Sequence, residues 1–231
     1  MDLKLLQQLN AERGGRKAAI LVTDMADGNQ RLVRKSNVDP DDPLAAEFSK
    51  RFRSGKSGMV QIPDGDVFLN VSVPSPRLVV VGAVHISQAL VPMAEIAGFD
   101  VTVIDPRTAF ATEDRFPRSG LKAEWPEDVL KEQPLDAYTA VAAVTHDPKI
   151  DDYPLIDALK TGCFYIGALG SRKTHGKRLE RFKEAGVDPN LFQNIEAPIG
   201  LDIGSASPEE IAVAVLASVI KALRKAEEPV T

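Results

Sequence analysis

Apolar and polar positions change their pattern near residue 76 of the chain. Before this point, short apolar runs alternate with charged segments and turns, which is typical of antiparallel strands. The pattern predicts a helix over Leu3–Ala11, strands over Ala18–Thr23 and Gln30–Arg34, a helix over Leu44–Phe52, and strands over Met59–Ile62 and Val67–Val73. Because Pro74-Ser75-Pro76 interrupts both patterns, we expect a small N-terminal α+β domain over residues 1–75 and a second domain over residues 76–231.

After residue 76, continuous apolar runs alternate with amphipathic segments. Leu78–Val81 is apolar at every position, as in a strand that is buried on both faces. The pattern predicts strands over Leu78–Val81, Val101–Ile104, Leu121–Trp125, Ala140–Thr145, Phe164–Leu169 and Asn194–Ile199, and helices over His85–Ala97, Pro126–Glu132, Asp151–Lys160, Ser171–Ala185 and Ser207–Arg224. Six strands that alternate with helices predict an α/β fold, a Rossmann-type doubly wound parallel sheet.

The predicted topology gives the place where a ligand would bind. In a doubly wound sheet, ligands occupy the crevice beyond the carboxyl ends of the strands, where the strand order reverses. With strand order 3-2-1-4-5-6, this reversal falls between the first and the fourth strand of the second domain. We therefore expect the turn Gly82–His85 and the loop Thr145–Pro148 to face one crevice, provided that the strand order holds.

The turn after the first of these strands resembles only part of a dinucleotide-binding fingerprint. Gly82 matches the first glycine of G-x-G-x-x-G, but Val84 stands where the second glycine allows a pyrophosphate to approach closely. Asp105 ends the next strand, at about the spacing of the acid that binds a ribose hydroxyl. The turn is therefore either a ligand site that uses Gly82, His85 and Asp105 or a structural turn.

A second candidate for anion binding follows the fifth strand. It consists of consecutive residues at the start of a predicted helix: Gly170, Ser171, Arg172, Lys173, Thr174 and His175. Free backbone N–H groups at a helix start favour an anion, and hydroxyls, a guanidinium and an ammonium add further donors. For the later basic residues, Lys177, Arg178, Arg181 and Lys183, we expect a solvated helix face.

All three histidines of the chain, His85, His146 and His175, come directly after predicted strands. Neutral imidazoles at that edge could bind an oxygen-rich ligand or transfer protons. Asp147 follows His146 in the same loop. No HxxxH or CxxC spacing supports a metal triad.

The loop Ala197–Gly204 follows the last predicted strand and holds the remaining candidates. Gly200 permits a close backbone approach to a ligand, and Asp202 could accept a hydrogen bond from it. A plain strand-to-helix connection is the equal alternative.

Composition narrows the classes of function. The 231 residues carry a net charge of -5, which argues against a general nucleic-acid surface. A single cysteine, Cys163, excludes an intrachain disulfide, and no apolar run approaches the length of a membrane span. Together with the lack of a signal peptide pattern, this predicts a cytoplasmic protein. The chain has no Tyr-x-x-x-Lys pair and no G-x-S-x-G elbow, and Gly55-Lys56-Ser57 lacks the context of a P-loop.

Six ordered motifs after Pro76 resemble one known family: GAVHISQAL at 82–90, VIDPRTAF at 103–110, RFP at 115–117, THDPKIDD at 145–152, FYIGALGSRKTH at 164–175 and APIGLDIGSASPEEIA at 197–212. The sequence resembles the XdhC/CoxI family of accessory factors for xanthine dehydrogenase and related molybdenum hydroxylases. The resemblance implies a Rossmann domain that binds molybdenum cofactor (molybdopterin or its dinucleotide form), protects it during sulfuration and passes it to the target enzyme. Longer members have a cysteine-containing SGGC-type motif, whereas this N-terminal region contains no cysteine.

The resemblance and the residues agree on a phosphate-bearing ligand, because molybdenum cofactor carries a phosphate or a pyrophosphate. The implied partners are a molybdenum hydroxylase and a cysteine desulfurase, and the chain is expected to be a maturation chaperone more than a catalyst. Two alternatives use the same crevice: an NAD(P)-dependent oxidoreductase, supported by Asp105, and a nucleotide-sensing module. A homodimer that covers the edges of the N-terminal strands is a further expectation.

Overall fold

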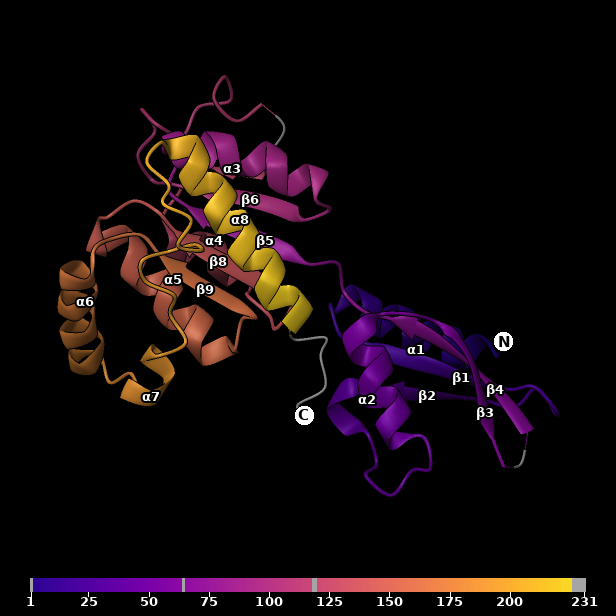
Figure 1. The fold of residues 1–231 in the computed structure, drawn as a ribbon. Coiled ribbons are helices and arrows are strands. Elements are labelled where there is room, and N and C mark those ends of the chain that lie inside the picture. The colour runs from indigo at the N-terminus through magenta and orange to yellow at the C-terminus, as the bar shows by residue number, and fades with distance from the viewer. Residues whose placement is uncertain (1, 64, 118–119, 226–231) are drawn as a thin grey trace. The chain divides into compact units, whose positions relative to one another are not determined.

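The computed structural model describes residues 2–63, 65–117 and 120–225 of the chain (Figure 1). These residues divide into two compact units, residues 2–74 and residues 75–225. Met1 and residues 226–231, the outer ends of the two predicted domains, lie outside the described residues, as do residues 64, 118 and 119.

The N-terminal unit is a four-stranded antiparallel sheet with two α-helices. Its elements are α1 (Leu3–Gly14), β1 (Ala19–Asp24), β2 (Gln30–Arg34), the short 3-10 helix η1 (Lys35–Asn37), α2 (Ala45–Ser54), β3 (Gly58–Ile62) and β4 (Gly65–Ser72). The strand order is β2-β1-β4-β3. Ile20 of β1 lies between Val33 of β2 and Val71 of β4, and the fully buried Phe48 of α2 adds to this core. The small α+β fold predicted from the sequence is therefore present.

The C-terminal unit is a five-stranded parallel sheet covered by helices. Its elements are β5 (Arg77–Val81), α3 (His85–Ile96), β6 (Asp100–Ile104), β7 (Gly120–Lys122), α4 (Pro126–Glu132), β8 (Thr139–Ala143), α5 (Pro148–Thr161), β9 (Tyr165–Ala168), α6 (Arg172–Glu184), α7 (Pro189–Phe192) and α8 (Pro208–Lys225). The strand order is β7-β6-β5-β8-β9, and all four strand pairs are parallel. The predicted Rossmann-type sheet is confirmed.

Helices cover both faces of this sheet, which explains the continuous apolar run in β5. Helices α3 and α8 lie side by side on one face (Figure 1), and the side chains of Leu78 and Val80 belong to the core on that face. The side chains of α4, α5, α6 and α7 pack on the other face, to which Val79 and Val81 belong. Successive side chains of a strand alternate between faces, so a doubly covered strand is apolar throughout. In the described part of the chain, no helix combines the length and apolarity needed to cross a lipid bilayer.

The predicted sixth strand over Asn194–Ile199 is wrong. This segment forms only an isolated parallel bridge, in which Glu196 pairs beside β9 with Gly167. The Glu196 N–H donates to Ile166 O, and the Ala168 N–H donates to Glu196 O. Pro198 has no N–H to continue such a ladder, so pairing ends after one residue. The apolar pattern of the segment reflects burial of Ile195 and Ile199 in the two cores instead.

Candidate functional site

The reversal of strand order lies where the sequence predicted it, because β5 has β6 on one side and β8 on the other. Gly82 follows β5, and Thr145 lies in the loop after β8. Gly82 has φ of +119°, and a Cβ built on it would lie 2.7 Å from Cγ2 of Thr145. The two loops are therefore in direct contact, and glycine is required at this position for both its backbone conformation and the space it leaves.

Asp105, at the end of β6, is fully buried and its carboxylate is saturated with donors. Oδ2 accepts hydrogen bonds from the Ala83 N–H at 2.8 Å and from Arg107 Nη2 at 2.7 Å, while Oδ1 accepts from the N–H and Nε of Arg107. Burial acts to raise the pKa of Asp105, but the bonds from Arg107 and Ala83 hold this pKa below its usual value. A carboxylate has about four lone-pair sites, so a ribose hydroxyl would have to displace one of these donors.

Two arginines that were not predicted as site residues, Arg107 and Arg115, stabilise the turn that follows β5. Arg115 donates to the carbonyl oxygens of Ala83 and Phe110 and to Oε1 of Gln88. The Arg107 guanidinium also lies over the ring of Phe110, 4.7 Å from its centroid. Both arginines belong to motifs that carry the family resemblance, VIDPRTAF and RFP, and that was the available signal.

His85 and His146 are both exposed at the carboxyl edge of the sheet. His85 is the first residue of α3, whose N-cap Val84 provides no side-chain hydrogen bond. His146 has φ of +66°, an unusual conformation for a residue other than glycine. The next residue, Asp147, caps α5 by accepting a hydrogen bond from the Lys149 N–H. Within the described ranges, no three His, Cys, Asp or Glu side chains are placed to share a metal ion.

The start of α6 has the features of an anion site. Ser171 caps the helix by accepting from the Thr174 N–H, and the two hydroxyl oxygens are 3.1 Å apart. Gly170 has φ of +130°, and a Cβ there would lie 3.1 Å from Thr174. Arg172 and Lys173 are exposed in the first turn of the helix. The backbone can therefore approach a ligand closely, beside free N–H groups and two cations.

His175 is placed differently from the other two histidines. Its ring stacks on Phe192 of α7, with the centroids 4.5 Å apart, and its Nδ1 is buried without a hydrogen-bond partner in the described part of the chain. Burial and the nearby Arg178 lower the pKa of His175, so its neutral form dominates near pH 7.

Behind both loops of the crevice lies a buried pair that sequence reasoning missed. Asp151 in the first turn of α5 is 1% exposed, and Arg178 of α6 is 2% exposed. Thr145 Oγ1 donates to Asp151 Oδ1 at 2.6 Å, and Arg178 Nη2 donates to Leu169 O at 3.3 Å. We expected Arg178 to lie on a solvated face, and this expectation is wrong. Its position four residues before the buried Phe182 was the signal, since such residues share a helix face.

The loop after residue 196 is fastened to the sheet by one glutamate. Glu196 Oε1 accepts from the Tyr165 hydroxyl at 3.0 Å and from the Gly200 N–H at 2.8 Å, and Oε2 accepts from the Ser218 hydroxyl. A Cβ on Gly200 would lie 2.9 Å from backbone atoms of α8. Gly200 thus has a packing role, whereas Asp202 is exposed further along the loop.

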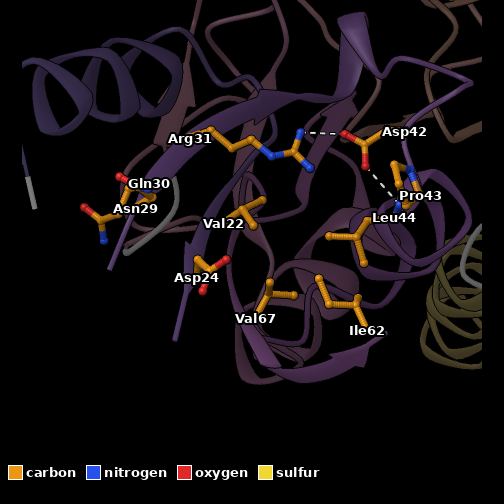
Figure 2. A pocket seen from close by; sticks show the side chains of 10 residues that line it. All are labelled: Val22, Asp24, Asn29, Gln30, Arg31, Asp42, Pro43, Leu44, Ile62 and Val67. Atoms are coloured by element: carbon orange, nitrogen blue, oxygen red, sulfur yellow. Dashed lines mark hydrogen bonds and ion pairs between the residues drawn. The ribbon is translucent and has the colours of Figure 1, made fainter. Parts of the chain in front are cut away.

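A separate cavity of about 270 Å³ lies in the N-terminal unit (Figure 2). Its lining combines apolar and polar side chains: Val22, Asp24, Asn29, Gln30, Arg31, Asp42, Pro43, Leu44, Ile62 and Val67. Arg31 Nη1 donates to Asp42 Oδ2 at 2.5 Å across it. That hydrogen bond lowers the pKa of Asp42. The cavity contains none of the site residues that the sequence predicted.

Comparison with known proteins assigns the family. The model of the XdhC Rossmann domain matches residues 78–219, which is more than half of the chain and includes every predicted site residue. The chain belongs to the XdhC family. It is 32% identical over 161 residues to a probable xanthine dehydrogenase subunit of Bacillus subtilis, covering 69% of this chain and 47% of that protein.

Two further relatives extend the comparison. The molybdenum cofactor insertion chaperone PaoD of Escherichia coli is 29% identical over 155 residues, covering 67% of this chain and 42% of PaoD. This XdhC chain therefore spans less than half the length of the B. subtilis protein and of PaoD. A solved structure described as a xanthine dehydrogenase from Bacillus halodurans matches with a TM-score of 0.68 at 23% identity, covering 97% of this chain and 68% of that one, and supports the fold alone.

Proposed function

We propose that this chain is a cytoplasmic accessory factor that binds molybdenum cofactor and delivers it to a xanthine dehydrogenase-type molybdenum hydroxylase. The name of PaoD, a molybdenum cofactor insertion chaperone, supports the ligand, and the B. subtilis relative supports the class of partner. A cysteine desulfurase that sulfurates the bound cofactor is a further proposed partner. The observation that carries the proposal is the arrangement of the glycine, hydroxyls and cations of residues 170–174 at the start of α6.

The residues at this site fit the phosphate end of the cofactor. Gly170 leaves room for a close approach, while Ser171 and Thr174 offer hydroxyls beside the free N–H groups of the helix start. Arg172 and Lys173 would neutralise the charge of the phosphate. When bound, the cofactor supplies the molybdenum and the pterin. The exposed His85 and His146 would hydrogen-bond its polar groups from the neighbouring loops.

Retention of released cofactor tests this proposal. Purified protein, mixed with molybdenum cofactor and passed through a desalting column, is expected to retain both molybdenum and pterin fluorescence. Arg172→Ala is expected to weaken retention about tenfold, because a charge-assisted hydrogen bond contributes roughly 1.5 kcal/mol. Lys183→Ala, an exposed cation at the far end of α6, is the matched control and should change nothing. Equal retention by both variants would contradict the site, and no retention by the wild type would contradict the function.

A nicotinamide-dependent oxidoreductase is the second candidate, favoured by the position of Asp105 at the end of β6. The four hydrogen bonds on its carboxylate count against this role. Calorimetric titration with NAD(H) and NADP(H) separates the candidates, since micromolar binding with hydride transfer would favour the oxidoreductase.

A further inference from the structure

Asp151 and Arg178 are two buried groups of opposite charge that interact electrostatically, with no hydrogen bond between them. Asp151 Oδ2 and Arg178 Nε and Nη1 are shielded from solvent, and no described residue offers them a hydrogen-bond partner. Buried arginines and carboxylates normally satisfy each other through paired N–H···O bonds. Buried polar groups left unpaired in a native structure point to a partner that is not part of the chain.

The contacts of Arg178 are few and weak for a buried guanidinium. Besides the 3.3 Å bond to Leu169 O, its Nε lies 4.0 Å from Asp152 Oδ1. Asp152 is already engaged, because Arg181 donates to both of its oxygens at 2.5 Å and 2.9 Å. A buried charge with so few hydrogen bonds is energetically costly. An anion that reached Arg178 would therefore be stabilised by the hydrogen bonds that this guanidinium does not form within the protein.

The position of the pair connects it to both loops of the crevice. Leu169, which accepts the bond from Arg178, directly precedes Gly170 and the helix cap Ser171. Helical side chains lean toward the N-terminus of their helix, which brings this guanidinium to the proposed phosphate site. On the other side, Asp151 accepts from Thr145, the residue packed against Gly82.

We propose that Arg178 is an anion-binding residue and that Asp151 is its counter-ion until the anion binds. A phosphate monoester bound at the start of α6 takes Arg178 as a ligand, and Asp151, having lost its counter-ion, takes up one proton from solvent on Oδ2. The proposal rests on the proposed anion site of α6 and adds to it a binding residue and a proton linked to binding.

The charges that face Asp151 set the direction of this linkage. Arg178 and Arg181 face it from α6, Arg107 from the loop after β6, and Asp152 from its own helix. Burial raises the pKa of Asp151 to about 6 even with Arg178 beside it. Withdrawal of Arg178 toward an anion and the negative charge of that anion both raise this pKa further. Proton uptake is therefore expected just above pH 6.

Calorimetric titration with adenosine 5′-monophosphate tests the linkage, with adenosine as the matched probe that lacks the phosphate. At pH 7, titrations in two buffers of different ionisation enthalpy give the number of protons taken up. The wild type is expected to take up more protons than Asp151→Asn, in which the acid cannot titrate. Because both proteins bind the same probe, the difference between them cancels the protons that the monophosphate itself takes up. Equal uptake by the two proteins, or equal affinity for adenosine and its monophosphate, would overturn the proposal.

Variants of the arginines test the binding residue itself. Arg178→Lys keeps a charge but loses the planar guanidinium, and is expected to weaken monophosphate affinity about tenfold. Arg178→Gln serves as a second variant if its circular dichroism shows a folded chain. Lys183→Gln, which removes an exposed cation further along α6, should leave the affinity unchanged. Unchanged affinity in Arg178→Lys would overturn the proposal. Retention of molybdenum cofactor is measured separately, so failure here leaves the proposed function standing.

Discussion

Each unit of the chain has a carboxylate near an arginine, and the pKa of the carboxylate is shifted in opposite directions in the two units. In the N-terminal unit, a direct bond from Arg31 (Figure 2) lowers the pKa of Asp42, and the Arg31 side chain is half exposed. In the C-terminal unit, burial raises the pKa of Asp151 to about 6, although the hydrogen bond from Thr145 and the charge of Arg178 both act to lower it. The sign of the shift is thus set by whether a hydrogen bond to the charged form offsets desolvation.

This difference indicates which region is built for a ligand. At the N-terminal cavity, Arg31 and Asp42 bond each other directly, as in a structural pair. Among the described residues, four of the five buried side-chain atoms without partners lie in the C-terminal unit, three of them on Asp151 and Arg178. Proteins violate polar satisfaction mainly where function requires it. The unit with the family match is therefore also the unit that holds most of the unmet hydrogen-bonding capacity among the described residues.

Alanine substitution of one glycine in each unit should give the largest contrast. Gly82→Ala combines φ of +119° with a Cβ 2.7 Å from Thr145, and is expected to cost about 3 kcal/mol in free energy of unfolding. Gly28→Ala, at φ of +74° in open space, should cost about 1 kcal/mol. Urea unfolding at pH 7 measures both. Equal costs would show that the contact between the two crevice loops is not tight.

The opposite pKa shifts predict opposite dependence of stability on pH. Asp151 has a raised pKa in the folded state, so its ionisation destabilises the fold as pH rises from about 4 through 6, by about 3 kcal/mol in total. The pKa of Asp42 is lower in the folded state than in the unfolded chain, so the ionised carboxylate stabilises the fold at pH values above the unfolded-state pKa. This stabilisation is lost as pH falls below about 4.

Urea unfolding from pH 3 to pH 8 checks these signs against variants that cannot titrate. The stability of the wild type relative to Asp151→Asn should fall across the range, while its advantage over Asp42→Asn should shrink only at the acid end. If the difference in free energy of unfolding between wild type and Asp151→Asn does not vary with pH, the pKa of Asp151 is not raised. The contrast with Asp42 would then be wrong.

The parts of the fold that could be predicted are those in which burial leaves a periodic pattern. The run at 78–81 indicated a doubly covered strand, and β5 packs both faces. The run at 194–199 was equally apolar but forms one bridge, because Pro198 ends the ladder and the side chains fill two cores. An apolar run reports burial, whereas a strand also needs partners for its N–H and C=O groups.

The contact between the two loops was predictable for the same reason, since topology fixes the edge at which Gly82 and Thr145 meet. The burial of Arg178 was missed although its spacing from Phe182 was a signal, because the sequence places four cations on one helix and does not show what covers each of them. Asp105 stood at the expected position, but its saturation by Arg107 depends on a side-chain conformation that spacing does not encode.

Removal of the N-cap of α6 should have the smallest effect on stability. It also tests whether one residue of the C-terminal unit serves both the fold and the ligand. Ser171→Ala is expected to cost about 1 kcal/mol of stability, since the Thr174 N–H loses its acceptor, whereas Ser171→Gly should cost only a few tenths. If the hydroxyl also binds phosphate, both variants lose monophosphate affinity to the same extent despite their different stabilities. Thermal unfolding and calorimetry on the two proteins separate the roles: affinity that follows stability would make Ser171 a cap alone, and affinity lost equally in both would make it a ligand as well.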